Sequence, residues 1–231
     1  MPEGVLSAPI LIGGALISAS ALAYGVRRLD YERIPQAAVL AAAFFVSSLF
    51  SVPIGPSSAH LLLNGLMGLV LGWSAIPTIA IALLLQAVFF GFGGLLVLGV
   101  NILNVALPAL VCALTLRPWL HHTQGQNGFL IGTLAGAVGV LLTALLLCGS
   151  LALSGAEFIP AAKVILLTYL PLAVVEAAIC GFVLRFILKV SPELLLPSSP
   201  DQHRRRQTGT AVAGCETCPT TKAPAKEENQ L

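Results

Sequence analysis

The sequence contains one long stretch, residues 34–116, without a single Asp, Glu, Lys or Arg. Charged residues make up only 10% of the whole chain, whereas a soluble domain carries about 25%. Water cannot solvate so uncharged a surface, which excludes an ordinary soluble enzyme, a nucleic-acid binder and a disordered chain. The stretch favours a helical membrane protein, because about 20 apolar residues span a bilayer as a helix. The alternating pattern of a membrane β-barrel is absent from it.

Seven apolar segments are separated by charges or by turn-forming Gly, Pro and Ser residues. We therefore expect an all-α fold, a polytopic bundle of about seven transmembrane helices. The predicted spans are 8–26, 34–52, 60–73, 76–92, 97–116, 128–152 and 160–188.

The basic residues predict the orientation of the bundle, since cytoplasmic loops carry an excess of Lys and Arg. With the N-terminus outside and the C-terminus cytoplasmic, every Lys and Arg except Lys163 falls on the inner side. We expect a transmembrane domain over residues 1–189 and a disordered cytoplasmic tail over residues 190–231, which has few large apolar side chains. The tail contains one Cys-x-x-Cys pair, Cys215 and Cys218, but zinc sites usually need a second pair.

Small residues recur at helical spacing in two spans, where they let helix backbones approach closely. Gly128, Gly132 and Gly136 predict packing inside the bundle. Ala15, Ala19 and Ala23 form a similar stripe on the first span, which fits either internal packing or the docking of a second membrane subunit.

Polar side chains in lipid are costly unless they are satisfied, so each one is a candidate for a functional site. His60 and Asn64 are four residues apart and would share one helix face, and Asn101 and Asn104 are three apart. The other polar residues of the apolar part are Gln86 and Glu176. The amides allow a structural reading, in which they satisfy helix ends or each other. Glu176 allows one as a packed, protonated or hydrogen-bonded group. Glu176 also allows a place on a translocation path.

His60 is the strongest candidate for a metal ligand, because it is the only histidine of the apolar part and follows a Pro/Gly/Ser-rich loop. A neutral imidazole suits a borderline metal ion. The chain has no Walker A loop, HExxH or GxSxG motif. We therefore do not expect an enzyme, and any ATP that drives transport must be hydrolysed by another chain.

Four blocks of sequence carry a family resemblance: PEGVLS at 2–7, SAHLLLNGLMG at 58–68, QAVFFGFGG at 86–94 and GVNILNVALP at 99–108. Together they make the chain resemble the CbiM/NikM proteins over residues 2–189. These are the membrane-embedded substrate-capturing components of energy-coupling-factor importers for cobalt and nickel. The form HLLLNG is more similar to the nickel branch.

The resemblance implies that the chain binds one transported Ni²⁺ or Co²⁺ near the outer face of the cell inner (plasma) membrane, with no permanent cofactor. In the family the ligands are nitrogens: the terminal amine, the backbone nitrogen and imidazole of the second residue, and a histidine after the second span. The first would be that of Met1 and the last is His60. Asn64, Asn101 and Asn104 would hold His60 or the N-terminal segment in place.

The resemblance also implies partners: a transmembrane coupling subunit and two ATPase subunits, with a small accessory membrane subunit as a further candidate, and no nucleic acid. Ala15, Ala19 and Ala23 would dock on the coupling subunit.

The chain departs from the family at its start, where Met1-Pro2-Glu3-Gly4 lacks the second-position histidine. The nitrogen of Pro2 carries no proton, so it cannot ligate a metal after deprotonation. We expect that Met1 aligns with the third residue of the family and that a Met-His pair is encoded immediately upstream.

Two other functions remain open at this point. A self-sufficient secondary transporter or channel would need internal symmetry and ionisable groups near the midplane, for which only Glu176 qualifies and no clear repeat is visible. A membrane enzyme would need a paired acid, base or nucleophile, which the sequence does not offer.

Overall fold

The computed structural model describes residues 6–49, 52–54, 57–91, 93–120 and 126–195 of the chain. All seven predicted helices are present, and most of their ends lie within about two residues of the predicted ones. They are α1 (Ala8–Arg27), α2 (Ile34–Ser47), α3 (Asn64–Leu71), α4 (Ala75–Phe90), α5 (Leu98–Thr115), α7 (Gln126–Ser154) and α8 (Ile159–Val190). The all-α fold is confirmed. Three small elements were not predicted: a one-turn helix α6 (Arg117–Leu120) and an antiparallel hairpin of β1 (Val52–Ile54) and β2 (Ser57–Ala59).

Five helical stretches of the described chain are long and apolar enough to cross a membrane: 8–27, 64–90, 98–115, 127–154 and 156–190. The third and fourth predicted spans fall into one of these stretches, because α3 and α4 are joined only by a 3-10 turn over Gly72–Ser74. With eight residues, α3 is about 12 Å long, far less than the roughly 30 Å of a bilayer core. It is therefore a half-length helix inside the bundle. The 14-residue α2 is also shorter than predicted: it ends at Ser47, and the predicted end at residue 52 is the first residue of β1.

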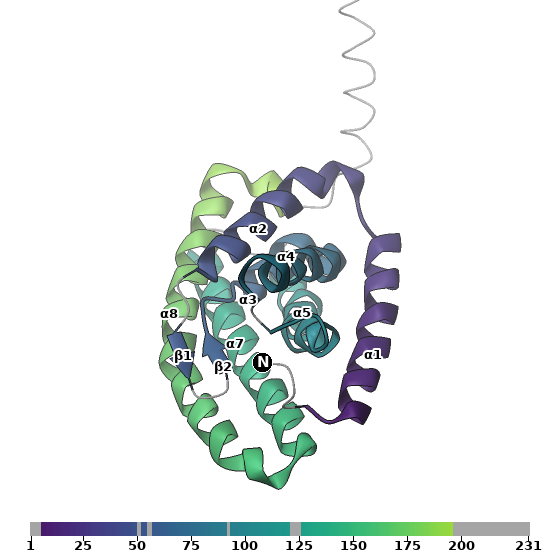
Figure 1. Cartoon of the computed structure of the whole chain (residues 1–231). Helices are drawn as coiled ribbons and strands as arrows, with labels where there is room; N and C mark the ends of the chain where they lie inside the picture. The colour runs from purple at the N-terminus through teal and green to yellow at the C-terminus, as the bar shows by residue number, and fades with distance from the viewer. Residues whose placement is uncertain (1–5, 50–51, 55–56, 92, 121–125, 196–231) are drawn as a thin grey trace, which may run out of the picture. The chain divides into compact units, whose positions relative to one another are not determined.

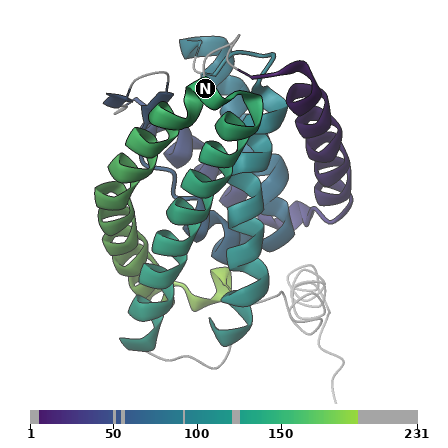
Figure 2. The ribbon, with the colours of Figure 1, turned by 90° about the horizontal axis from the view of Figure 1, so that it is seen from below.

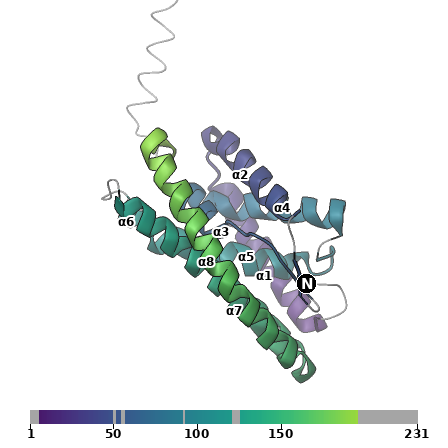
Figure 3. The same cartoon turned by 90° about the vertical axis from the view of Figure 1, so that its left-hand side faces the viewer.

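The helices form three groups (Figure 1). The long helices α7 and α8 lie side by side along one flank, and α1 lies on the opposite flank beyond α5. The same separation of α1 from α7 and α8 is visible from below (Figure 2). Between the flanks, α3 packs against α5 and α7, and α2 lies against α4 (Figure 3). The segment that follows α2 thus leads from the surface helix α2 to the most enclosed helix, α3.

Every residue of α3 is buried, and two of its glycines allow its close contact with the neighbouring helices. A Cβ added to Gly65 would lie 2.1 Å from the carbonyl oxygen of Ala135 in α7, and one added to Gly68 would lie 2.0 Å from that of Ala109 in α5. Only a residue without a side chain fits at either position. These contacts wedge α3 between α5 and α7.

The glycine stripe of α7 packs inside the bundle, as predicted. Added Cβ atoms would lie 2.2 Å from Leu188 at Gly128, 2.6 Å from the carbonyl oxygen of Cys180 at Gly132, and 2.7 Å from that of Glu176 at Gly136. These four-residue steps all face α8, and at Gly132 and Gly136 the two helices meet through backbone contact.

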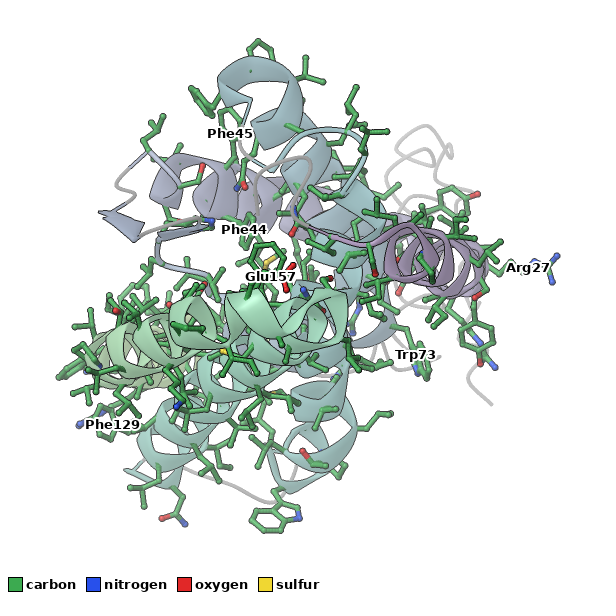
Figure 4. All side chains as sticks on the ribbon, turned by 60° about the horizontal axis from the view of Figure 1, so that its bottom comes forward. Arg27, Phe44, Phe45, Trp73, Phe129 and Glu157 are labelled. Carbon is green, nitrogen blue, oxygen red and sulfur yellow. The ribbon has the colours of Figure 1, made fainter. Side chains whose placement is uncertain are left out.

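Basic and aromatic residues lie close together where α1 and α3 end. The Tyr24 ring meets Trp73 edge-on at 4.8 Å and carries the Arg28 guanidinium 5.4 Å above its centre. Arg117 lies against Gly72 in the turn between α3 and α4, and Arg27 points away from α1 (Figure 4). This basic cluster agrees with the predicted cytoplasmic face, but the orientation of the chain across a membrane stays a prediction.

The described chain ends shortly after α8, with a 3-10 turn over Pro192–Leu194. The predicted tail from residue 196 onward lies outside the described residues, as do Cys215 and Cys218. The boundary placed at residue 189 and the disorder of the tail therefore stay predictions.

Candidate metal-binding site

His60 lies in an extended segment between β2 and α3, outside the membrane-spanning stretches. The prediction that His60 and Asn64 share one helix face was wrong, because α3 begins only at Asn64. Residues 60–63 instead form a connecting segment, which we call the ligand loop.

The imidazole of His60 is held on one side and available on the other. Its ring meets the ring of Phe44, from α2, edge-on at a centroid distance of 5.8 Å, and Phe44 is fully buried. Figure 4 shows Phe44 pointing from α2 into the bundle. His60 Nδ1 lies 3.0 Å from the carbonyl oxygen of Leu61. When Nδ1 carries the proton and donates it there, Nε2 presents its lone pair, which is the arrangement of a metal-binding imidazole.

Burial also favours the metal-binding form of this side chain. Removal from water lowers the pKa of His60 below its ordinary value of 6.5, against the opposing effect of the Leu61 carbonyl. Burial disfavours the charged imidazolium, so the ring is neutral at physiological pH and can accept a cation.

A serine of α2 ties the ligand loop to the surface helix. The hydroxyl of Ser47 lies 2.8 Å from the carbonyl oxygen of Leu61, to which it donates, and 2.7 Å from that of Phe44. Phe44 and Ser47 are three residues apart, so one face of α2 holds both the ring of His60 and the backbone after it. No feature of the local sequence had marked either residue.

Glu176 of α8 holds the ligand loop from the other side. Its Oε2 accepts a hydrogen bond of 3.0 Å from the Leu62 amide, and its Oε1 accepts one from the Leu63 amide. The side chain is fully buried. Of the readings left open for Glu176, the structure gives it the role of a hydrogen-bonded group that grips the backbone.

Asn64 is also fully buried, but it points into the bundle. Its Nδ2 lies 2.8 Å from Thr143 Oγ1, 3.3 Å from the Val105 carbonyl oxygen and 3.4 Å from that of Gly139, and its Oδ1 accepts from the Gly65 amide. These contacts join the start of α3 to α5 and α7. Asn64 therefore anchors the helix that follows the ligand loop, and within the described residues its side chain makes no hydrogen bond to His60.

The two asparagines of α5 differ in their surroundings. Asn104 is buried, and its Oδ1 lies 3.5 Å from the hydroxyl of Ser150 on α7. Its Nδ2 has no hydrogen-bond partner among the described residues. Asn101 is only partly buried. Neither side chain is hydrogen-bonded to His60 within the described chain, so their part in the site stays a prediction.

The other predicted metal ligand, the terminal amine of Met1, belongs to the N-terminal segment. Met1 and the N-terminal segment through residue 5 lie outside the described residues. Within the described ranges, no three His, Cys, Asp or Glu side chains come together as a metal cluster. Of the two predicted metal ligands, His60 is therefore the one that lies within the described residues.

The alanine stripe of α1 is largely free. Ala15, Ala19 and Ala23 are all exposed, although Ala15 also lies against Gly99 of α5. The residues of α1 that face the bundle are Gly14, Ser18 and Gly25. Internal packing therefore uses a different face of α1, and the stripe remains open for a partner.

Comparison with known proteins identifies a family for this arrangement. Residues 1–194 match the family CbiM, described as the cobalt uptake substrate-specific transmembrane region. The match ends with the last turn after α8 and leaves out the tail.

Individual relatives agree with the family match. A putative metal transport protein of Haemophilus influenzae is 39% identical over 197 residues, which are 84% of this chain and 96% of that protein. The fused nickel transport protein NikMN of Rhodobacter capsulatus is 30% identical over 212 residues, 79% of this chain and 60% of its own length. A putative cobalt transport protein, CbiM 2 of Methanocorpusculum labreanum, is 30% identical over 210 residues, 84% of this chain and 90% of that protein.

Solved structures share the fold. The crystal structure of a transition metal transporter superimposes with a TM-score of 0.74 at 26% identity and covers 90% of this chain and 98% of its own. A truncated transition metal transporter gives a TM-score of 0.73 at 27% identity, covering 82% of this chain and 98% of its own.

Proposed function

The chain belongs to the CbiM family of cobalt uptake transmembrane proteins, and from this premise we propose that it captures Ni²⁺ or Co²⁺ for an energy-coupling-factor importer. It is a multi-pass membrane protein of cobalt and nickel transport, not an enzyme. In the proposed mechanism it binds the ion near the outer face of the inner membrane, and partner subunits that hydrolyse ATP drive release inward.

The placement of His60 is the observation that supports this function most strongly. Its ring is packed on Phe44, its Nδ1 is engaged by the Leu61 carbonyl, and its burial favours the neutral form. An imidazole prepared in this way binds borderline divalent ions such as Ni²⁺ and Co²⁺. We propose that Nε2 of His60 is one of the metal ligands.

The remaining ligands are proposed to come from the N-terminal segment, beginning with the terminal amine at Met1. A chain with a Met-His pair before Met1 would supply the four nitrogens that suit Ni²⁺. We propose that Asn101 and Asn104 hold this segment, while Asn64 fixes the start of α3 under the ligand loop. The Nδ2 of buried Asn104 has no acceptor among the described residues, which supports this proposal because a buried donor without an acceptor is costly.

Uptake by cells tests the proposed function directly. Cells that express this chain together with a coupling subunit and ATPase subunits should accumulate radioactive nickel or cobalt, and cells with this chain alone should accumulate far less. Full uptake by the chain alone would instead favour the self-sufficient transporter, which is the second candidate function.

The docking surface for the coupling subunit is proposed to be the exposed stripe of Ala15, Ala19 and Ala23. A phenylalanine at Ala19 should prevent the close helix approach that small residues allow and so reduce co-purification of the coupling subunit, without changing metal affinity. The matched control is a phenylalanine at Ile17, which is 54% exposed on another face of α1. Equal co-purification of both variants would remove the stripe from the proposal.

A further inference from the structure

We propose that Glu176 is a positioning residue of the metal site, which fixes the backbone after His60 and thereby the direction of its imidazole. The inference rests on the proposed function in one respect, because it takes His60 as a metal ligand.

A single carboxylate grips two consecutive peptide groups of the ligand loop. The Leu62 amide donates to Oε2 at 3.0 Å and the Leu63 amide donates to Oε1. Both oxygens are used, and the side chain is fully buried. More than 100 residues of chain separate the donors from the acceptor, so this contact joins α8 to a distant part of the sequence, the ligand loop.

The start of α3 requires such an acceptor. The first amides of a helix have no partner within the helix, and a side-chain oxygen at the N-cap usually satisfies one of them. Here the N-cap residue is Leu63, whose side chain has no oxygen to accept such a bond. Leu63 also has a positive φ of 50°, the one such non-glycine value among the described residues. Glu176 of α8 accepts from the amide of this N-cap residue and from the Leu62 amide before it, at the end of α3 that favours negative charge.

The hydrogen bonds to Glu176 begin two residues after His60, at Leu62. Between them, the carbonyl oxygen of Leu61 accepts from Ser47 of α2 and faces Nδ1 of the imidazole. The ligand loop is thus held from α2 at Leu61 and from α8 at Leu62 and Leu63. Without the hydrogen bonds to Glu176, the Leu61 peptide group can rotate. The imidazole of His60 should then change its orientation too, because its Nδ1 is hydrogen-bonded to the Leu61 carbonyl.

The packing of α8 does not depend on this carboxylate. Gly136 of α7 lies against the backbone of Glu176, and Gly132 lies against Cys180 and Gly181. Loss of the carboxylate should therefore disturb the ligand loop more than the contact between α7 and α8. This difference separates a positioning role from a general structural one.

The test compares Glu176→Gln with the matched control Thr78→Val in the full chain, in lipid nanodiscs. The glutamine keeps one acceptor and turns an NH₂ group toward the other amide. Thr78 is buried in α4 and donates only within its own helix, to the Ser74 carbonyl at 2.7 Å, so its replacement removes a buried hydrogen bond away from the loop. The readouts are hydrogen exchange at Leu62 and Leu63, the ¹⁵N shifts of the His60 imidazole, and Ni²⁺ affinity.

For Glu176→Gln we expect exchange at the two amides at least about tenfold faster, altered imidazole shifts and a nickel affinity about 10–100-fold weaker, as for other groups that orient metal ligands. Thr78→Val should match the wild type in all three. If Glu176→Gln matches Thr78→Val in exchange, imidazole shifts and affinity, the proposal is overturned.

Two further variants keep the test decisive. Should Glu176→Gln not fold, Glu176→Asp keeps the charge but shortens its reach, and it should show the same changes to a smaller extent; wild-type behaviour would overturn the proposal. His60→Ala separates the two inferences. Nickel binding that survives His60→Ala refutes the proposed site and the positioning role with it. Binding that is lost in His60→Ala but unchanged in Glu176→Gln or Glu176→Asp refutes the positioning role alone.

Discussion

Replacing Gly68 by alanine is expected to push α3 away from α5. The new Cβ would lie 2.0 Å from the carbonyl oxygen of Ala109, 2.8 Å from its carbonyl carbon and 3.1 Å from its Cα. Carbon atoms in contact are normally about 3.5–4.0 Å apart. All three neighbours are backbone atoms of a helix, which cannot turn aside as a flexible side chain does, so the two helices must separate by roughly 1 Å or more.

The cost follows from this overlap. Overpacking of a core typically costs about 1–3 kcal/mol, and contact with backbone places Gly68→Ala near the upper end. Alanine in a helix recovers about 1 kcal/mol relative to glycine, which leaves a net loss of roughly 2 kcal/mol. At about 2–4 °C per kcal/mol for a chain of this size, the melting temperature should fall by roughly 4–8 °C.

Gly149 of α7 provides the control, because an added Cβ there meets nothing within 4 Å. Gly149→Ala should therefore melt at or slightly above the wild-type temperature. Thermal unfolding of the three proteins in the same detergent, followed by circular dichroism, makes the comparison. If Gly68→Ala melts as high as Gly149→Ala, α3 is not wedged against α5 as described.

Two other outcomes are expected from the contacts of the site. Asn64→Leu leaves the Gly65 amide without its acceptor, so the protein should lose about 1–3 kcal/mol of stability, and an unchanged melting temperature would contradict the role of Asn64 as the anchor of α3. Because burial lowers the pKa of His60 below 6.5, the folded state favours the neutral ring, so His60 contributes stability above its unfolded pKa that is lost as the pH falls. In the metal-free protein the His60 imidazole should therefore titrate below pH 6.5, the ordinary value for a histidine; an NMR titration with a midpoint at or above 6.5 would refute this.

Most of the helices follow from the sequence alone, because apolar runs bounded by charges or by Gly and Pro have only one stable form in a bilayer. The glycine stripe of α7 was predicted for the same kind of local reason: a four-residue spacing places all three glycines on one face. The start of α3 was predicted four residues too early. Its true start depends on the left-handed Leu63 and on Glu176, a contact from far along the chain that no local pattern encodes.

The candidate site divides in the same way. His60 was identifiable because it is a solitary histidine in an apolar region. Its supports come from α2 and α8, where Phe44 and Ser47 look like ordinary membrane-helix residues and Glu176 left several readings open. Asn64 was expected to share a helix face with His60 and to hold it in place, but its side chain satisfies backbone groups of α5 and α7. Side chains that act through backbone contacts leave no spacing signal.

The central claim is that His60 provides a nitrogen ligand to a transported metal ion. Its most direct test is the titration of the full chain in nanodiscs with Ni²⁺ and with Co²⁺, for the wild type and His60→Ala, each with and without a Met-His extension. The account predicts saturable binding that His60→Ala abolishes while its melting temperature stays within a few degrees of the wild type. Unchanged nickel and cobalt affinity in a folded His60→Ala protein would contradict it.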